Sequence, residues 1–135
     1  MKASELRVGN LVNYRIIDEF DKRKEWLEVS QIDHDDLRIL EIENENNQDY
    51  QPIKLTEEWL LKLGFSEYKD FGYSTKQFDL LPLQGFSYNL KTKKIMIMQK
   101  GNIQSHWLDN EVNYVHQLQN LYFALTEREL IFKAI

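Results

Sequence analysis

The stretch "VNYVHQLQNLYFALT", Val112 to Thr126, runs for fifteen residues without a charged side chain. Asp, Glu, Lys and Arg make up 29% of the whole chain, so about four charges would be expected here by composition. The apolar residues recur at helical spacing, which predicts a C-terminal helix over about residues 112–126. A surface helix normally carries charge on its solvent-facing side. What the second face of this helix contacts is therefore the first question.

A helical wheel at about 100° per residue separates the predicted helix into two faces. One is an apolar stripe made of Tyr114, Val115, Leu118, Leu121, Tyr122 and Leu125. The other is an uncharged band made of Asn113, His116, Gln117, Gln119, Asn120, Phe123 and Ala124. Amides can be dehydrated without the heavy penalty of a charge, and interface cores are depleted of charge.

The uncharged band predicts a covered surface, and three coverings are open. Another layer of the same chain, such as the 37–42 segment or a loop, is one. A partner protein or a second copy of the chain is another, and simple exposure is the third. If a partner covers the band, the protein-binding residues are His116, Gln119, Asn120 and Phe123.

The first half of the chain has the pattern of β-structure. A turn at Gly9-Asn10 leads into a β-prone run, and "EWLEVSQI" (25–32) and "LRILEI" (37–42) alternate imperfectly between apolar and polar residues. Three short strands in about forty residues predict a small, strongly bent antiparallel sheet. An SH3-like partial barrel is our first interpretation and a plain meander the second.

The middle of the chain predicts a short helix and then further strands. In "LTEEWLLKLGF", Thr56 is a good N-cap and Gly64 a good C-terminal stop, which predicts a helix over 56–63. The runs "KQFDLLPL" (76–83), "GFSYNL" (85–90) and "KIMIMQK" (94–100) predict antiparallel strands. Both faces of the last run are apolar, which predicts a central strand. We expect one α+β domain over 1–135, with 1–50 and 51–135 as candidate sub-lobes.

Composition excludes several classes of protein. The 135 residues suffice for a hydrophobic core, and the absence of cysteine removes disulfide scaffolds, thiolate zinc sites and cysteine nucleophiles. The N-terminus lacks the apolar core of a signal peptide, and no run reaches the length of a membrane span. We therefore expect a cytoplasmic protein that does not enter a membrane.

The net charge of −5 argues against a general nucleic-acid-binding protein, which needs a basic surface. The acids gather in residues 33–49, where seven acids accompany one arginine. A small basic hairpin over 91–100 is the exception. Its alternative role would be nucleic-acid binding, with Tyr88 and Trp107 as stacking groups. The candidate residues are Lys91, Lys93, Lys94 and Trp107, with Lys100 at the end of the hairpin.

No residue pattern points to catalysis, a metal or a cofactor. His34 stands in the oxygen-rich "DHDD", which lacks the spacing of an EF-hand loop. His106 follows Ser105, but a catalytic triad has no adjacency signature. His116 has no histidine or carboxylate four residues away, and no glycine-rich phosphate loop occurs. We predict a non-enzymatic protein without cofactors or a metal site.

Three segments together resemble a known group of proteins. They are "ELRVGNLV" (5–12), "PIKLTEEWLLKLGF" (52–65) and "YVHQLQNLYFALTEREL" (114–130). In this order they resemble a family of small uncharacterised proteins from Bacteroides-type gut bacteria, their prophages and mobile elements. The resemblance implies a phage or mobile-element setting and carries over no catalytic residue. Where the family pattern has "LTGEEL", this chain has "LTEREL", so Glu127 replaces a glycine.

These observations favour a protein that works by binding another protein, as a modulator or inhibitor of a host or phage component. Its two candidate surfaces are the acidic N-terminal half and the uncharged band. Self-association into a homo-oligomer is a further expectation. A nucleic-acid-associated module is the alternative function.

Overall fold

The computed structural model of the chain describes residues 1–43, 46–70, 72–80, 85–98 and 105–132. The chain divides into two compact units. The first contains Met1–Lys54 and Tyr114–Arg128, and the second contains Leu55–Asn113 and Glu129–Ile135. Both units combine helix with antiparallel sheet, which confirms the α+β class. The C-terminal helix is grouped with the N-terminal half of the chain, although it lies within the predicted 51–135 sub-lobe.

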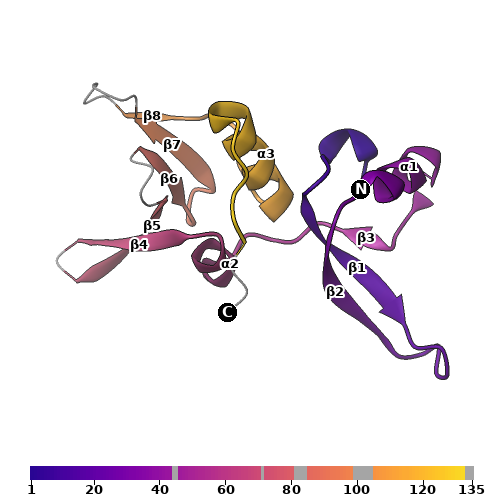
Figure 1. The fold of residues 1–135 in the computed structure, drawn as a ribbon. Helices are drawn as coiled ribbons and strands as arrows, with labels where there is room; N and C mark the ends of the chain where they lie inside the picture. The colour runs from indigo at the N-terminus through magenta and orange to yellow at the C-terminus, as the bar shows by residue number, and fades with distance from the viewer. Residues whose placement is uncertain (44–45, 71, 81–84, 99–104, 133–135) are drawn as a thin grey trace. The chain divides into compact units, whose positions relative to one another are not determined.

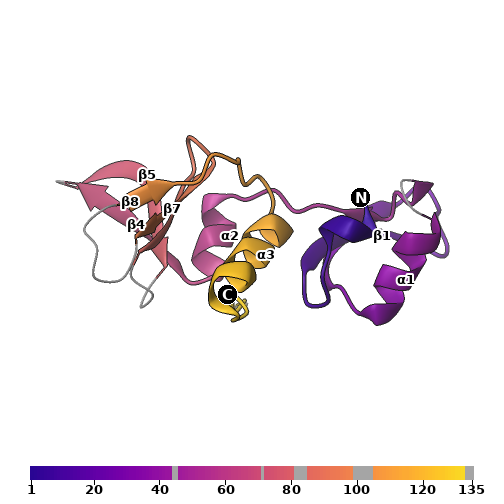
Figure 2. The ribbon, with the colours of Figure 1, turned by 90° about the horizontal axis from the view of Figure 1, so that it is seen from above.

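The elements of each unit follow the chain order (Figures 1 and 2). The first unit contains the 3-10 helix η1 (Ala3–Glu5), β1 (Leu11–Ile17), β2 (Glu25–Gln31), α1 (His34–Glu43), β3 (Tyr50–Gln51) and α3 (Val115–Thr126). The second unit contains α2 (Glu57–Lys62), β4 (Phe65–Asp70), β5 (Tyr73–Leu80), β6 (Phe86–Asn89), β7 (Lys94–Met98) and β8 (Ser105–Trp107).

The predicted Gly9-Asn10 turn opens the first sheet. Gly9 has φ +97°, a conformation that glycine adopts without steric cost, and the N–H of Asn10 donates to the carbonyl of Arg7 at 3.0 Å. Strands β1 and β2 then pair antiparallel from Leu11 opposite Gln31 to Ile17 opposite Glu25. The strand order is β2-β1-β3, so β2 is an edge strand. Both predicted strands are confirmed, and the SH3-like interpretation stays a prediction.

The predicted strand over 37–42 is wrong, because this segment lies within helix α1. The side chains of Asp33 and Asp36 exchange hydrogen bonds with each other's backbone N–H at 2.9 and 2.8 Å, which is a capping box at the helix start. Leu37 and Leu40, three residues apart, both pack into the core of the unit. The apparent two-residue alternation was the sequence of a helix whose other apolar residues, Ile39 and Ile42, are exposed.

The core of the first unit gathers residues from every part of its N-terminal segment. Its buried members are Leu6, Val12, Ile32, Leu40 and Tyr50. The Tyr50 hydroxyl donates to the Asp36 carboxylate at 2.6 Å, and its ring meets the ring of Tyr14 edge-on. The start of α1 is therefore tied directly to β3.

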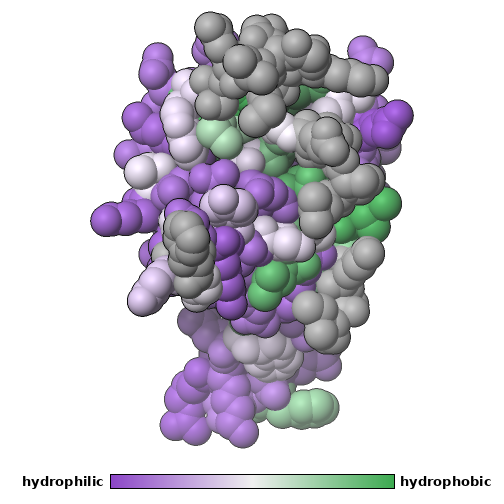
Figure 3. Space-filling model, turned by 90° about the vertical axis from the view of Figure 1, so that its left-hand side faces the viewer, coloured by the Kyte–Doolittle hydropathy of each residue, from purple (hydrophilic) through white to green (hydrophobic). Residues whose placement is uncertain are grey.

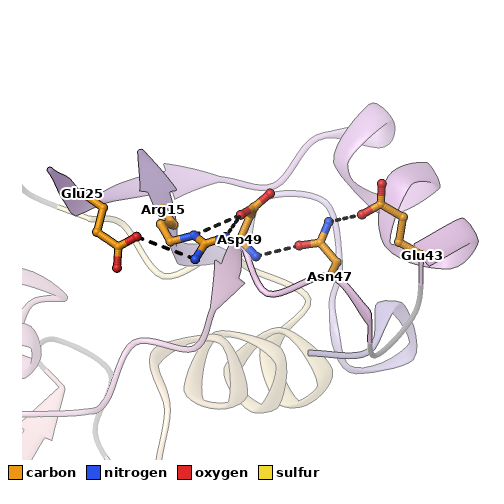
Figure 4. A network of polar contacts seen from close by, with 5 residues as sticks. All are labelled: Arg15, Glu25, Glu43, Asn47 and Asp49. Atoms are coloured by element: carbon orange, nitrogen blue, oxygen red, sulfur yellow. Dashed lines mark hydrogen bonds and ion pairs between the residues drawn. The ribbon is translucent and has the colours of Figure 1, made fainter. Parts of the chain in front are cut away.

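A network of polar contacts holds the outer end of this sheet to the segment that follows α1 (Figure 4). Arg15 on β1 donates to the Asp49 carboxylate at 3.0 and 3.2 Å, and it lies 3.7 Å from a carboxylate oxygen of Glu25 on β2. Asn47 accepts from the N–H of Asp49 and donates to Glu43 at the end of α1. The network thus links both long strands to the helix.

In the second unit, helix α2 has the two ends that the sequence predicts. The Thr56 hydroxyl accepts from the N–H of Trp59 at 3.3 Å, and Glu57 and Glu58 occupy the first turn. Gly64 follows the helix with φ +93°. The predicted helix over 56–63 is therefore confirmed.

The second sheet has five antiparallel strands in the order β4-β5-β6-β7-β8. Strand β7 lies between two others, as the apolar "KIMIM" predicts. Strands β4 and β8 were not predicted, and the predicted run over 76–83 begins inside β5, its last three residues lying outside the described ranges. The buried apolar residues include Leu60, Leu63, Phe65, Phe78, Tyr88 and Ile95. The face shown in Figure 3 is mainly hydrophilic, with its hydrophobic side chains in separate groups.

Candidate functional site

The uncharged band of α3 is covered, at least in part, by the first residues of the same chain. Gln119 is buried, with 3% of its surface exposed. Its side-chain oxygen accepts from the N–H of Leu11 at 2.8 Å, and its amide nitrogen donates to the carbonyl of Gly9 at 3.3 Å. A single glutamine therefore satisfies two backbone groups at the point where the turn enters β1.

Asn10 and Asn120 extend this contact. The Asn10 amide donates to the side-chain oxygen of Asn120 at 2.8 Å, and Asn120 donates to the carbonyl of Glu5 at 3.1 Å. Asn10 itself is fully buried and accepts from the N–H of Arg7 at 2.7 Å. An amide supplies both a donor and an acceptor, which a carboxylate or an ammonium group cannot do. This explains why the band carries amides in place of charges.

Phe123 contacts a cation from the N-terminal segment. The guanidinium carbon of Arg7 lies 4.1 Å from the centroid of the Phe123 ring. An aromatic face attracts a cation placed above it. The charge that is missing from α3 at this position is therefore supplied by the segment that covers it.

His116 is the remaining member of the predicted protein-binding set. Only 2% of its surface is exposed, and its ring stacks on that of Tyr114 with 5.8 Å between centroids and 9° between planes. Burial lowers the pKa of His116, and the nearby Glu5 partly opposes this by raising it. The imidazole is therefore neutral at neutral pH. The protein-binding role given to His116, Gln119, Asn120 and Phe123 stays a prediction, while the structure shows two of these residues buried in the chain's own fold.

The most exposed apolar surface lies elsewhere, on the β1–β2 hairpin. Phe20, in the turn, has 99% of its side chain exposed. Four further apolar residues are 44–47% exposed, namely Ile17, Trp26, Leu27 and Val29. Because side chains alternate along a strand and Ile17 lies opposite Glu25, Ile17, Leu27 and Val29 share one face. Trp26 lies on the other face, where its indole N–H donates to Glu28 at 2.9 Å.

Strand β2 also presents its backbone. It is at the edge of the sheet, and among the described residues no strand pairs with its outer side. Apart from Ser30, every residue of β2 is exposed. Soluble proteins usually protect such edges with charge, with proline or with a covering element. An exposed edge flanked by Leu27 and Val29 can accept an added strand from another chain.

The residues of the predicted basic hairpin lie near one end of the second sheet. Lys91 and Lys93 are exposed in the β6–β7 turn, and Lys94 begins β7. Trp107 on β8 lies opposite Met96 and is 45% exposed, so it shares a face with Lys94, two residues before Met96. Lys100 lies outside the described residues.

The stacking role predicted for Tyr88 is wrong. Only 1% of Tyr88 is exposed, and its hydroxyl donates to the carbonyl of Val112 at 2.6 Å. Burial, with a smaller effect of Glu111, raises its pKa to about 12. Tyr88 is therefore a core residue with a satisfied hydroxyl.

The residues weighed for chemistry are dispersed. His34 is the first residue of α1, and His106 is exposed on β8. Within the part of the chain that the structure describes, no three His, Asp or Glu side chains gather as a metal site would require. The same residues include no helix that is both long enough and apolar enough to cross a membrane. What the described residues offer instead are a surface and a cavity.

The hairpin surface could have been found from the sequence by one signal. The run from Ile16 to Val29 places five large apolar residues among eight charged ones in a hairpin of two strands, more than one buried face can use.

The chain matches no protein-family model, no curated protein and no solved structure. The class that fold and sites define is an α+β protein with an exposed apolar hairpin, and the family resemblance drawn from the sequence stays a prediction.

Proposed function

We propose that this chain is a cytoplasmic, non-enzymatic protein-binding module and that it binds its partner through the edge strand β2. The observation that carries the proposal is the exposed hairpin surface made of Ile17, Phe20, Trp26, Leu27 and Val29. Apolar and aromatic residues of this kind supply most of the binding free energy in protein interfaces. The sequence resemblance suggests a host or phage component as the partner.

The geometry favours addition of a strand over docking of a helix. The outer edge of β2 offers a row of backbone donors and acceptors that an extended segment can pair with. Leu27 and Val29 flank that row on one face and Trp26 on the other, so the partner's side chains would meet apolar surface on both faces. Arg15 and Glu25, 3.7 Å apart, lie on the same face as Leu27 and can fix the register by charge.

The test is site-specific photo-crosslinking in host cells, followed by mass spectrometry and by binding measurements with the purified partner. A crosslinker at position 27 should capture one partner, and a crosslinker at the exposed Tyr73 in the second unit is the matched control. Val29→Lys places a charge on the edge and should weaken binding about tenfold or more, without lowering stability. Identical products from positions 27 and 73 would reject the proposal. Products that contain only this chain would assign the edge to a homo-oligomer.

Nucleic-acid binding is the second candidate function, and it is favoured by the common face of Lys94 and Trp107 beside Lys91 and Lys93. A lysine beside an exposed indole can hold a backbone phosphate while a base stacks. The test is a titration with single-stranded DNA and RNA at low salt, comparing the wild type with Trp107→Ala. Binding that weakens with salt and with the substitution would support this candidate, and no binding at low salt would end it.

A further inference from the structure

A cavity of about 480 Å³ lies at the N-terminal end of α3, wholly within the first unit. Its size falls in the range of pockets that hold small organic ligands. The lining combines an aromatic ring, an imidazole, an amide and two opposite charges. It consists of Met1, Lys2, Glu5, Pro52, Tyr114, His116 and Gln117.

His116 gives this cavity an unsatisfied polar atom. The side chain is almost fully buried, and its Nδ1 has no hydrogen-bond partner among the described residues. The parallel Tyr114 ring restricts the orientation of the imidazole. Buried polar atoms are nearly always hydrogen-bonded in native proteins, so an exception that lines a cavity points to a bound group.

The helix end adds a second donor. Tyr114 is the N-cap of α3, and the N–H of Val115 is already taken by the carbonyl of Ile53 at 2.8 Å. The next N–H, that of His116, has no acceptor within an α-helix, because the first turn has no preceding carbonyls. The positive end of the helix dipole lies at the same place. Two donors of one residue thus border the cavity.

The charges at the cavity define which anion fits. Lys2 supplies one positive charge, and Glu5 supplies one negative charge. A ligand with one negative charge can approach Lys2 and the helix end, whereas a dianion such as phosphate is repelled by Glu5. The neutral imidazole can donate from Nδ1 without adding charge.

We propose that this cavity binds the carboxylate group of a small ligand, which accepts hydrogen bonds from Nδ1–H and the backbone N–H of His116 while Lys2 balances its charge. The carboxylate could belong to a free organic acid or to the C-terminus of a peptide, and both present the same group to the site. The inference does not depend on the hairpin surface, because the two sites share no residue.

The full chain labelled with ¹⁵N tests this by NMR titration. Three probes are used, namely propionate for a free acid, N-acetylglycine for a peptide C-terminus, and propionamide as a neutral control of the same shape. We expect one or both carboxylates to shift the ring and backbone signals of His116 with a Kd of about 1 mM, and propionamide to leave them unchanged. The acid that binds more tightly identifies the source. Equal effects of propionamide, or no shift with either acid, would overturn the proposal.

Substitutions supply the second arm of the test. His116→Phe retains an aromatic ring beside Tyr114 but removes Nδ1, and Lys2→Met retains the length of an exposed side chain but removes its charge. Each should weaken the carboxylate at least about tenfold. Glu5→Gln should admit inorganic phosphate, which the wild type excludes. If His116→Phe does not fold, the wild-type ring signals and Lys2→Met still decide the question, and unchanged affinity in Lys2→Met would reject the assignment of charge.

Discussion

The side-chain oxygen of Gln119 accepts a hydrogen bond of 2.8 Å from the backbone N–H of Leu11, a residue 108 positions earlier in the chain. This bond joins the last helix to the first strand. With the bonds of Asn10 and Asn120, it makes a buried amide contact between the two ends of the sequence. The uncharged helix face is thereby explained by the fold of the chain itself.

Gln119→Ala should destabilise the protein by about 2–4 kcal/mol, because the N–H of Leu11 and the carbonyl of Gly9 lose their buried partner. The measurement is chemical denaturation followed by circular dichroism. Ala124→Ser, at an exposed position of the same helix, is the control and should change stability by less than about 0.5 kcal/mol. Equal stabilities of the two variants would show that the amide contact contributes nothing.

Phe123→Ala should cost about 1–2 kcal/mol, since the ring loses both its packing and the guanidinium of Arg7 above it. Arg7→Met retains most of the apolar stem and removes the charge. A double-mutant cycle isolates the pair, and we expect a coupling of about 0.5–1 kcal/mol. A coupling of zero would mean that the contact between ring and cation is not stabilising.

Glu127→Gly should stabilise the protein by about 1 kcal/mol. Glu127 ends α3 in the left-handed conformation, with φ 59°, and its N–H donates to the carbonyl of Phe123 at 2.7 Å. A side chain is strained in this conformation, whereas glycine is not. Glu127→Ala is the matched control, because alanine retains the Cβ and should bring no such gain. Thermal denaturation of both variants measures the difference, and a destabilised glycine variant would contradict this prediction.

Asp33 should make the stability of α1 depend on pH in the acidic range. Hydrogen bonds from the backbone and side chain at Asp36 lower the pKa of Asp33 below its usual 3.8. Because the folded-state pKa is the lower one, the stabilisation is fully present above the unfolded-state pKa and is lost as pH falls through the folded-state value. Carboxylate ¹³C shifts measure the pKa, and amide exchange in α1 measures the stability. Asp33→Asn caps without titrating and should remove this part of the pH dependence. A normal pKa for Asp33 would contradict the prediction.

The local elements that the sequence predicted correctly are those that carry their own signals. Gly9-Asn10 marks a turn because glycine adopts a positive φ, and Thr56 and Gly64 mark the two ends of α2 because each meets a requirement of the helix backbone. The segment 37–42 was misread as a strand because a short apolar run fits two periodicities. The cap formed by Asp33 and Asp36, which distinguishes them, stands just outside the run.

The sequence alone determined that α3 has an apolar stripe and an uncharged band, and that the band requires a partner rich in hydrogen-bonding groups. Only the tertiary structure decided which groups these are, because the contact spans 108 residues and local periodicity contains no information about partners so distant. The same holds for the cavity beside His116 and the exposed edge of β2. Each depends on which elements the folded chain places beside it, and on the places it leaves uncovered.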